Sequence, residues 1–251
     1  MTLALPARAK LNLDLEVIRR TDDGFHDVRT TIQAIGVHDL LEMVAAGQTS
    51  LTISGLLVAN SHENSILKAH HALELAVGRS LPTRFHLHKR IPPGSGMGGA
   101  SSDAAAALRG LAALHRLDVD LRALAMSIGA DVTFFLAGGT ARAEGRGEKL
   151  TSLPTPQAWF AIAWPGIELS TASVYLAWDE VQGEAPNQLL RAAERAEPRL
   201  VDFAERLGPR WQMTGSGSAF FLRCTDGEQA REATASLDCW TAVTRAVGRW
   251  A

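Results

Sequence analysis

The segment that most restricts how this chain can fold is IPPGSGMGGASSDAAAAL, residues 91–108, with glycines at positions 94, 96, 98 and 99. Glycine adopts backbone conformations that are closed to other residues, and the alanine-rich stretch that follows is typical of a helix. The sequence therefore predicts a tight loop that leads directly into a helix. A helix N-terminus carries partial positive charge and unpaired N–H donors, and Ser101 and Ser102 add hydroxyl groups there. This arrangement predicts a phosphate site.

Several kinds of glycine loop compete for this segment. Gly94, Gly96 and Gly99 match the dinucleotide pattern GxGxxG, but the helix predicted next is followed by another helix instead of the second parallel strand of a βαβ unit. A P-loop needs lysine and then serine or threonine after its last glycine, where this chain has Ala100 and Ser101. A protein-kinase loop needs HRD and DFG motifs, which the sequence lacks. A plain turn with a serine helix cap remains the structural alternative.

Hydrophobic periodicity predicts strands and helices in mixed order, and therefore an α+β fold. The turn TDDG at 21–24 joins two strands into a hairpin. The polar, proline-bearing stretch near 145–155 suggests a boundary between an N-terminal domain, 1–150, and a C-terminal domain, 151–251. The predicted strands cover 11–17, 28–35, 83–88, 158–164, 219–223 and 240–245, and the predicted helices cover 64–77, 101–115, 120–128, 187–206 (interrupted by Pro198) and 226–236.

Composition narrows the classes of protein. The 251 residues carry a net charge of −2, without the basic excess usual in a nucleic-acid binder. No apolar run is long enough for a membrane span, and the first residues lack the pattern of a secretory signal. Two cysteines without a CxxC motif fit a reducing cytoplasm. We therefore expect a cytoplasmic protein with neither nucleic acid nor membrane as partner. Composition leaves open whether it is a monomer or homodimer.

Four further segments, in order along the chain, accompany the glycine loop: PARAKLNLDL (6–15), DDGFHDVRT (22–30), GADVTFF (129–135) and TGSGSAFF (214–221). Together they resemble the GHMP small-molecule kinases, and within them the family that phosphorylates 4-diphosphocytidyl-2-C-methyl-D-erythritol. Each motif alone is weak, but the set extends from about residue 6 to about residue 223 and is specific. The chain departs from the family at Thr133, where proline is usual, and at Met97, where leucine is usual.

The resemblance implies a two-domain kinase with an S5-like N-terminal domain, a ferredoxin-like C-terminal domain and an active cleft between them. It implies ATP-dependent phosphorylation of the 2-hydroxyl of the cytidyl substrate in the non-mevalonate route to isoprenoid precursors, with Mg²⁺. A homoserine- or mevalonate-type kinase, or a non-catalytic ATP-binding sensor, remains the alternative. A dinucleotide oxidoreductase is disfavoured by the missing βαβ strand.

The family pattern makes Asp131 the catalytic base and places Lys10 beside it. A lysine there would stabilise the ionised carboxylate and could contact the γ-phosphate. Without the resemblance, Asp131 would be an ordinary helix-terminal aspartate and Lys10 a solvated strand-end charge. Lys10 is one of only four lysines in the chain.

On the substrate side, the resemblance implies that Phe25 stacks on the cytosine, with Tyr175 as the second ring. Phe25 replaces the family's tyrosine, which keeps a stacking face and loses a hydroxyl. His26 would read the base edge, and Asn12 and Thr171 would contact the substrate. A turn histidine and a core aromatic are the alternatives for His26 and Tyr175.

On the ATP side, the resemblance implies that the segment 92–102, referred to below as the phosphate loop, wraps the phosphates. Ser102 could contact Mg²⁺ or a β-phosphate oxygen. Asn64 would lie near the adenine, although a helix N-cap explains it almost as well. Lys89 could approach the nucleotide or be a solvated strand-end charge, and residues 215–217 could line the cleft. The expected ATP-binding residues are Pro92, Pro93, Gly94, Ser95, Gly96, Met97, Gly98, Gly99, Ala100, Ser101, Ser102 and Asn64.

Overall fold

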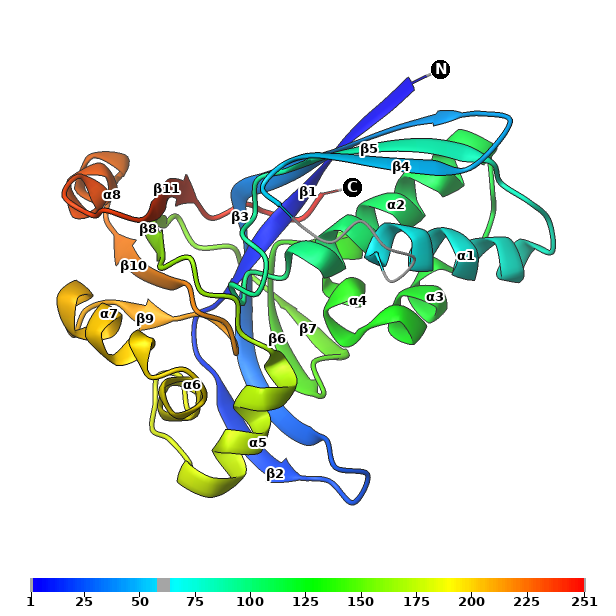
Figure 1. Cartoon of the computed structure of the whole chain (residues 1–251). Helices are drawn as coiled ribbons and strands as arrows, with labels where there is room; N and C mark the ends of the chain where they lie inside the picture. Colours follow the sequence, from blue (N-terminus) through cyan, green and yellow to red (C-terminus); the bar gives the residue numbers. More distant parts are fainter. Residues whose placement is uncertain (1, 58–63, 251) are drawn as a thin grey trace. The chain divides into compact units, whose positions relative to one another are not determined.

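The computed structural model describes residues 2–57 and 64–250, and the chain divides into two compact units (Figure 1). Unit 1 holds the chain up to Ala9, His38–Ile91 and Gly98–Ala137. Unit 2 holds Lys10–Val37, Pro92–Met97 and the chain from Gly138 onward. The phosphate loop therefore contributes its first part to unit 2 and its last part to unit 1. The expected domain boundary near 150 lies within unit 2 and stays a prediction.

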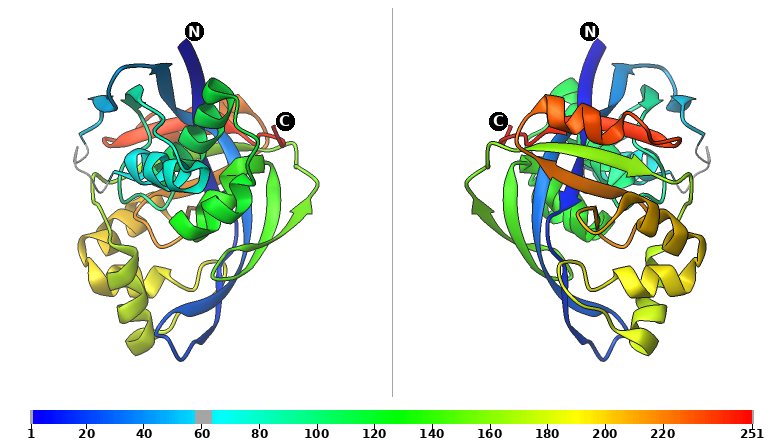
Figure 2. Two further views of the ribbon diagram at one scale, coloured as in Figure 1. Left: turned by 90° about the vertical axis from the view of Figure 1, so that its right-hand side faces the viewer. Right: turned by 90° about the vertical axis from the view of Figure 1, so that its left-hand side faces the viewer.

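In unit 1, strands support a layer of four helices. Strand β4 (Ser50–Gly55) runs parallel to β5 (Thr83–Lys89), which pairs antiparallel with the second half of β3 (His26–Ala45). Strand β1 (Thr2–Asn12) also pairs with β3. Figures 1 and 2 show the helices on one side of these strands. They are α1 (Ser65–Val77), α2 (Gly99–His115), α3 (Leu121–Ile128) and α4 (Ala130–Ala137).

Helix α2 lies at the centre of this layer because its side chains are small. Its buried positions include an unbroken run from Ser102 to Leu108, five residues of which are alanine or leucine. It contacts α1, α3 and α4. The alanine run that predicted a helix therefore also allows close packing between helices.

Unit 2 holds further strands of the seven-stranded sheet that contains β3, a second sheet, and four further helices. Strand β2 (Glu16–Arg20) and β6 (Thr140–Gly145) pair with the first half of β3, and β7 (Lys149–Leu153) pairs with β6, all antiparallel. The second sheet is antiparallel, in the order β11 (Trp240–Arg245), β8 (Trp159–Trp164), β10 (Phe220–Cys224) and β9 (Gln212–Met213). Its helices are α5 (Thr171–Val181), α6 (Leu190–Ala196), α7 (Arg199–Leu207) and α8 (Gly227–Thr234).

The α+β prediction is confirmed, and most predicted elements are present within a few residues. The strand predicted over 11–17 is wrong in its middle, because the chain leaves regular pairing there and the Asp14 carboxylate accepts a hydrogen bond from the Thr31 N–H at 2.6 Å. The helix predicted over 187–206 begins only at Leu190 and is divided by Pro198, which stands at the N-cap of α7. Strands β4, β6 and β7 and helices α4 and α5 were not predicted.

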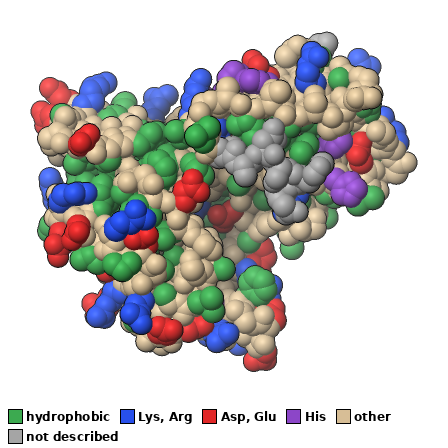
Figure 3. Space-filling view, in the orientation of Figure 1, with side chains coloured by type: hydrophobic (Ala, Val, Ile, Leu, Met, Phe, Trp, Pro, Cys, Tyr) green, Lys and Arg blue, Asp and Glu red, His purple; other side chains and the backbone are tan. Residues whose placement is uncertain are grey.

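Charged side chains of both signs are interspersed on the face of the molecule in Figure 3. Cys224 and Cys239 are free thiols. Over residues 2–57 and 64–250, no helix combines the length and the apolar character needed to cross a bilayer.

Residues 92–97 pack in unit 2 against the late glycine segment, residues 214–219. The Ser95 carbonyl accepts a hydrogen bond from the Ala219 N–H at 3.1 Å. Gly96 has φ +79°, and a Cβ on it would overlap the Thr214 carbonyl oxygen and lie 2.7 Å from the Gly217 nitrogen. A side chain on Gly217 would likewise overlap the Gly96 backbone. The two glycine segments are far apart in sequence. They can pack this closely only because neither Gly96 nor Gly217 has a side chain.

Replacing Gly96 by alanine should strongly destabilise this backbone packing. The left-handed conformation costs an alanine about 1–2 kcal/mol, and relief of the overlap with Thr214 and Gly217 should raise the total above about 3 kcal/mol. Gly78→Ala is the matched control, because Gly78 is left-handed, with φ +65° and ψ 23°, and has no atom within 4 Å of its Cβ position. Urea unfolding should show a much larger loss for Gly96→Ala; equal losses would contradict the packing.

Candidate functional site

Lys10 lies at the end of β1, next to both glycine segments of unit 2. Its backbone N–H donates to the Met97 carbonyl at 3.0 Å. Its ammonium donates to the Asn12 Oδ1. A Cβ on Gly215 would lie 3.2 Å from the Lys10 Nζ and 2.9 Å from the Asn12 Oδ1. The structure thus brings together Lys10, Asn12, the first part of the phosphate loop and the late glycine segment.

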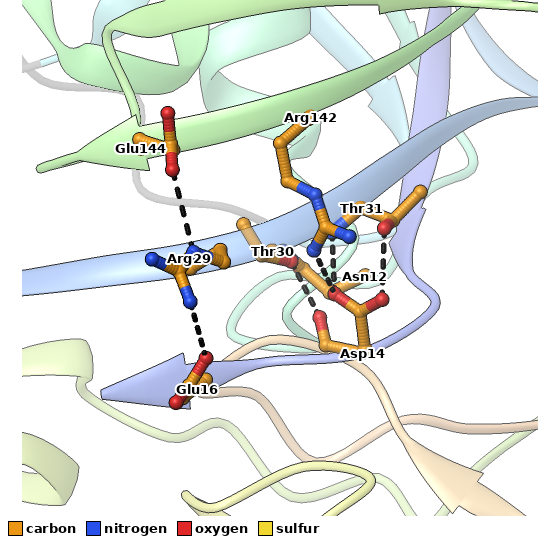
Figure 4. A network of polar contacts seen from close by, with 8 residues as sticks. All are labelled: Asn12, Asp14, Glu16, Arg29, Thr30, Thr31, Arg142 and Glu144. Atoms are coloured by element: carbon orange, nitrogen blue, oxygen red, sulfur yellow. Dashed lines mark hydrogen bonds and ion pairs between the residues drawn. The ribbon is translucent and has the colours of Figure 1, made fainter. Parts of the chain in front are cut away.

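A hydrogen-bonded chain fixes the orientation of the Asn12 amide (Figure 4). Its Nδ2 donates to the Thr30 hydroxyl at 2.8 Å, and that hydroxyl donates to the Asp14 carbonyl at 2.5 Å. Because the hydroxyl has a single proton, it must accept from Asn12, so the oxygen of the amide faces Lys10. The Asn12 backbone N–H donates to the Thr214 hydroxyl at 2.9 Å. Asn12 therefore holds the lysine, the strand and the late glycine segment together.

Asn187 anchors the late glycine segment from the other side. It is buried, and its Nδ2 donates to the carbonyls of Met213 and Gly215 at 2.8 and 2.9 Å. Thr171, at the first turn of α5, exchanges a hydrogen bond of 2.9 Å with the Ser216 hydroxyl. Thr171 and the late glycine segment thus lie together as expected. Asn187 was missed, because a single asparagine between helices carries no pattern.

His26 forms a buried aromatic and acidic site with α5. Its ring stacks on Tyr175 at 4.9 Å between centroids, and Trp178 meets it edge-on at 5.5 Å. Its Nε2 lies 2.7 Å from the Asp179 Oδ1, and Arg20 approaches the other oxygen of that carboxylate at 3.2 Å. Because a carboxylate only accepts, the Nε2 carries a proton, and in the neutral form of the ring the Nδ1 is then an acceptor. The protein contacts hold the His26 ring in place, and both a substrate contact and the alternative of a turn histidine with no ligand stay predictions.

Phe25 is exposed, in contrast to the buried His26. Its side chain is 56% exposed. The Arg146 guanidinium covers one face of its ring at 4.1 Å and is also paired with Asp23. In this structure the ring stacked on Tyr175 is that of His26, so stacking of a base between Phe25 and Tyr175 stays a prediction.

The glycines of the phosphate loop adopt the conformations that a phosphate cradle needs. Gly94, Gly96 and Gly98 have φ of +60°, +79° and +72°, and Gly98 is the N-cap of α2. The Ser95 hydroxyl donates to the Pro92 carbonyl at 2.6 Å, and the Met97 side chain is fully buried. These two side chains stabilise the loop, so recognition of an anion falls to its backbone N–H groups. The residues present fit a nucleotide triphosphate.

Lys89 is not a solvated strand-end charge. Its side chain is 5% exposed, and its Nζ lies 2.5 Å from the Asp39 Oδ2 and 2.8 Å from the Asp103 Oδ2. Burial alone would lower the pKa of Lys89, but the carboxylates of Asp103 and Asp39 outweigh burial and raise it. Burial raises the pKa of Asp103 to about 8 against the opposing effect of Lys89. Asp39 and Asp103 were missed as partners of Lys89, because neither stands near it in sequence.

Asp131 and Asn64 both lie at helix starts in unit 1. Asp131 is in the first turn of α4 and is partly buried. Its action together with Lys10, which belongs to unit 2, stays a prediction. The Asn64 Oδ1 accepts from the Ile66 N–H at 3.0 Å and caps α1. The cap is therefore present, and a nucleotide contact by Asn64 stays a prediction.

The expected Mg²⁺ depends on few protein ligands. Across the described ranges, no group of three or more His, Cys, Asp or Glu side chains is arranged to hold a metal ion. Mg²⁺ is commonly held by one or two protein groups together with substrate phosphates. Ser102, buried in the first turn of α2, stays the candidate ligand.

Comparison with known proteins gives one consistent result. Residues 64–139 match the GHMP kinases N terminal domain. A 4-diphosphocytidyl-2-C-methyl-D-erythritol kinase of Moorella thermoacetica is 35% identical over 94% of this chain and 94% of its own length. The enzyme of the same name from Thermus thermophilus is 37% identical over 93% of this chain and 92% of its own length.

Solved structures agree. A crystal structure of 4-(cytidine 5'-diphospho)-2C-methyl-D-erythritol kinase superposes with a TM-score of 0.85 at 34% identity, covering 98% of this chain and 100% of that one. The mevalonate kinase of Methanococcus jannaschii has a TM-score of 0.72 at 11% identity, covering 99% and 98%, and shares the fold. The chain therefore belongs to the family of 4-diphosphocytidyl-2-C-methyl-D-erythritol kinases, within the GHMP kinases.

Proposed function

We propose that this chain transfers the terminal phosphoryl group of ATP to the 2-hydroxyl of 4-diphosphocytidyl-2-C-methyl-D-erythritol in the cytoplasm. The observation that carries the proposal is the packing of the phosphate loop against the late glycine segment, with Lys10 beside both. Phosphoryl transfer needs positioning and charge neutralisation more than covalent chemistry. A cradle of backbone N–H groups with an adjacent ammonium supplies both.

Lys10 and Asp131 carry the chemical step in this proposal. Lys10 neutralises charge that develops on the transferred group, and Asn12 directs it by accepting from the ammonium. Asp131 accepts the proton of the attacking hydroxyl. ATP, with its Mg²⁺, supplies the phosphoryl group and part of the charge neutralisation. The presence of both Lys10 and Asp131 favours an active kinase over a non-catalytic sensor.

Recognition of the cytidyl group falls to His26 and its surroundings. The tautomer set by Asp179 leaves the His26 Nδ1 as an acceptor, which matches the exocyclic amine of cytosine. The sequence led us to expect a ring N–H facing a base acceptor, and the Asp179 contact favours the opposite polarity. Phe25, Tyr175, Asn12 and Thr171 complete the proposed substrate contacts.

Replacing Asp131 by asparagine should lower kcat by about 10²–10⁴-fold, because the amide cannot accept the proton. Binding of ATP should be retained, since the phosphate loop is intact. Single-turnover assays of ADP formation, with ATP binding measured by calorimetry on the same protein, check both statements. Turnover close to wild type would remove Asp131 as the base.

Replacing Asp179 by asparagine should raise the KM for the cytidyl substrate about tenfold or more, because it loosens control of the His26 tautomer. The KM for ATP should stay unchanged. Asp27→Asn serves as the control, because the Asp27 carboxylate pairs with the exposed Arg19, at 2.8 Å, and lies outside the His26 contacts. A shift in the KM for ATP instead would place His26 and Asp179 outside the base site.

Asn64 can be tested by separating its cap from its proposed contact with the nucleotide. Serine retains the N-cap, whereas alanine loses it at a cost of about 1 kcal/mol. We expect Asn64→Ser to unfold like wild type in urea but to have a raised KM for ATP. An unchanged KM in Asn64→Ser would leave Asn64 as a cap alone.

A further inference from the structure

A lysine and two aspartates are buried in unit 1 where the chain enters and leaves the phosphate loop. Lys89 ends β5, Asp39 lies within β3, and Asp103 lies in the second turn of α2. All three are at most 5% exposed. The lysine contacts both carboxylates, so these three residues, named the Lys89 cluster, join two strands to the helix.

The entry to the loop is held by Asp39. Its Oδ1 accepts from the Arg90 N–H at 2.5 Å and from the Ile91 N–H at 2.8 Å, and its Oδ2 accepts from Lys89. One carboxylate thus fixes three consecutive residues directly before Pro92. These are the last residues of unit 1 before the loop.

The exit from the loop is held by Lys89 and Asp103. The Asp103 Oδ2 accepts from the Lys89 ammonium at 2.8 Å. A Cβ on Gly99 would lie 2.9 Å from the Lys89 Nζ and 3.0 Å from the Ile91 Cγ2, so the helix start rests directly on the entry residues. Both ends of the loop therefore meet at one ion cluster.

The Asp103 Oδ1 is buried and has no hydrogen-bond partner among the described residues. A buried polar oxygen without a partner is costly, so the side chain of Asp103 depends on the contact of its Oδ2 with Lys89. Lys89 in turn contacts Asp39, and the three side chains therefore hold one another in place.

We propose that the Lys89 cluster is a positioning device for the nucleotide: it fixes the two ends of the phosphate loop relative to each other. This inference rests on the proposed function, because it assumes that the phosphate loop binds the phosphates. Lys89, Asp39 and Asp103 are positioning residues and need not touch the nucleotide.

Asp103→Asn tests the exit of the loop, because an amide keeps the shape of the side chain but weakens its charge-assisted contact with Lys89. We would measure the Kd for Mg²⁺–ATP by calorimetry, together with the free energy of unfolding in urea. The Kd of Asp103→Asn should rise several-fold, whereas a residue that only stabilises the fold would leave the Kd of the folded variant at the wild-type value.

Asp39→Asn tests the positioning role. Both oxygens of the Asp39 carboxylate accept hydrogen bonds, whereas an amide has a single acceptor oxygen. The Kd of Asp39→Asn for ATP at pH 7.5 should rise about tenfold or more. Glu42→Gln is the matched control, since Glu42 bridges the same two strands to His88 at 3.3 Å but is exposed. It should bind ATP like wild type.

The outcomes separate the inference from the proposed function. Wild-type protein that fails to bind ATP at any pH contradicts the proposed function. Wild type that binds ATP while folded Asp39→Asn and Asp103→Asn keep the wild-type Kd overturns the inference alone. If Asp39→Asn does not fold, the Kd of Asp103→Asn decides.

Discussion

The rest of the site depends on the direct backbone contact between the phosphate loop and the late glycine segment. Gly96 and Gly217 approach so closely that neither tolerates a Cβ. This contact brings the Met97 carbonyl to the Lys10 backbone and the Gly215 backbone to the Lys10 ammonium. The side chains of Asn12 and Asn187 then hold the strand and the glycine segment in place. A phosphate cradle made of backbone needs such support, because its own side chains are missing or turned inward.

Electrostatics adds a second constraint at the other end of the loop. Positive charge strengthens the binding of an anion. The Lys89 ammonium, however, is already paired with the buried side chains of Asp39 and Asp103. In the proposed complex, the attraction of the loop for phosphate therefore comes from its N–H groups and from the start of α2. The lysine that remains next to the loop in unit 2 is Lys10. The two lysines, alike in the sequence, thus perform different tasks: one organises the loop and the other is proposed to act on the phosphoryl group.

Patterns in neighbouring residues predicted those parts of the structure that depend on neighbouring residues. The glycine spacing predicted the loop, the alanine run predicted α2, and the family motifs identified Lys10 and His26, which the structure places next to Asn12 and Tyr175 respectively. Strand β4 and helix α4 escaped prediction because tertiary packing decides short apolar segments. Three polar residues also escaped, because their partners lie 50, 153 and 26 positions away in the sequence: Asp39, Asp179 and Asn187. A single aspartate or asparagine has no pattern that reveals such a partner.

The most direct test of the account is a crystal structure of the protein with a nonhydrolysable ATP analogue and Mg²⁺. The account predicts that the phosphates accept hydrogen bonds from backbone N–H groups of residues 94–102, with the Lys10 ammonium towards the terminal phosphate and Lys89 still bound to Asp39 and Asp103. Phosphates bound elsewhere, or a Lys89 side chain that leaves the carboxylates to reach the nucleotide, would contradict it.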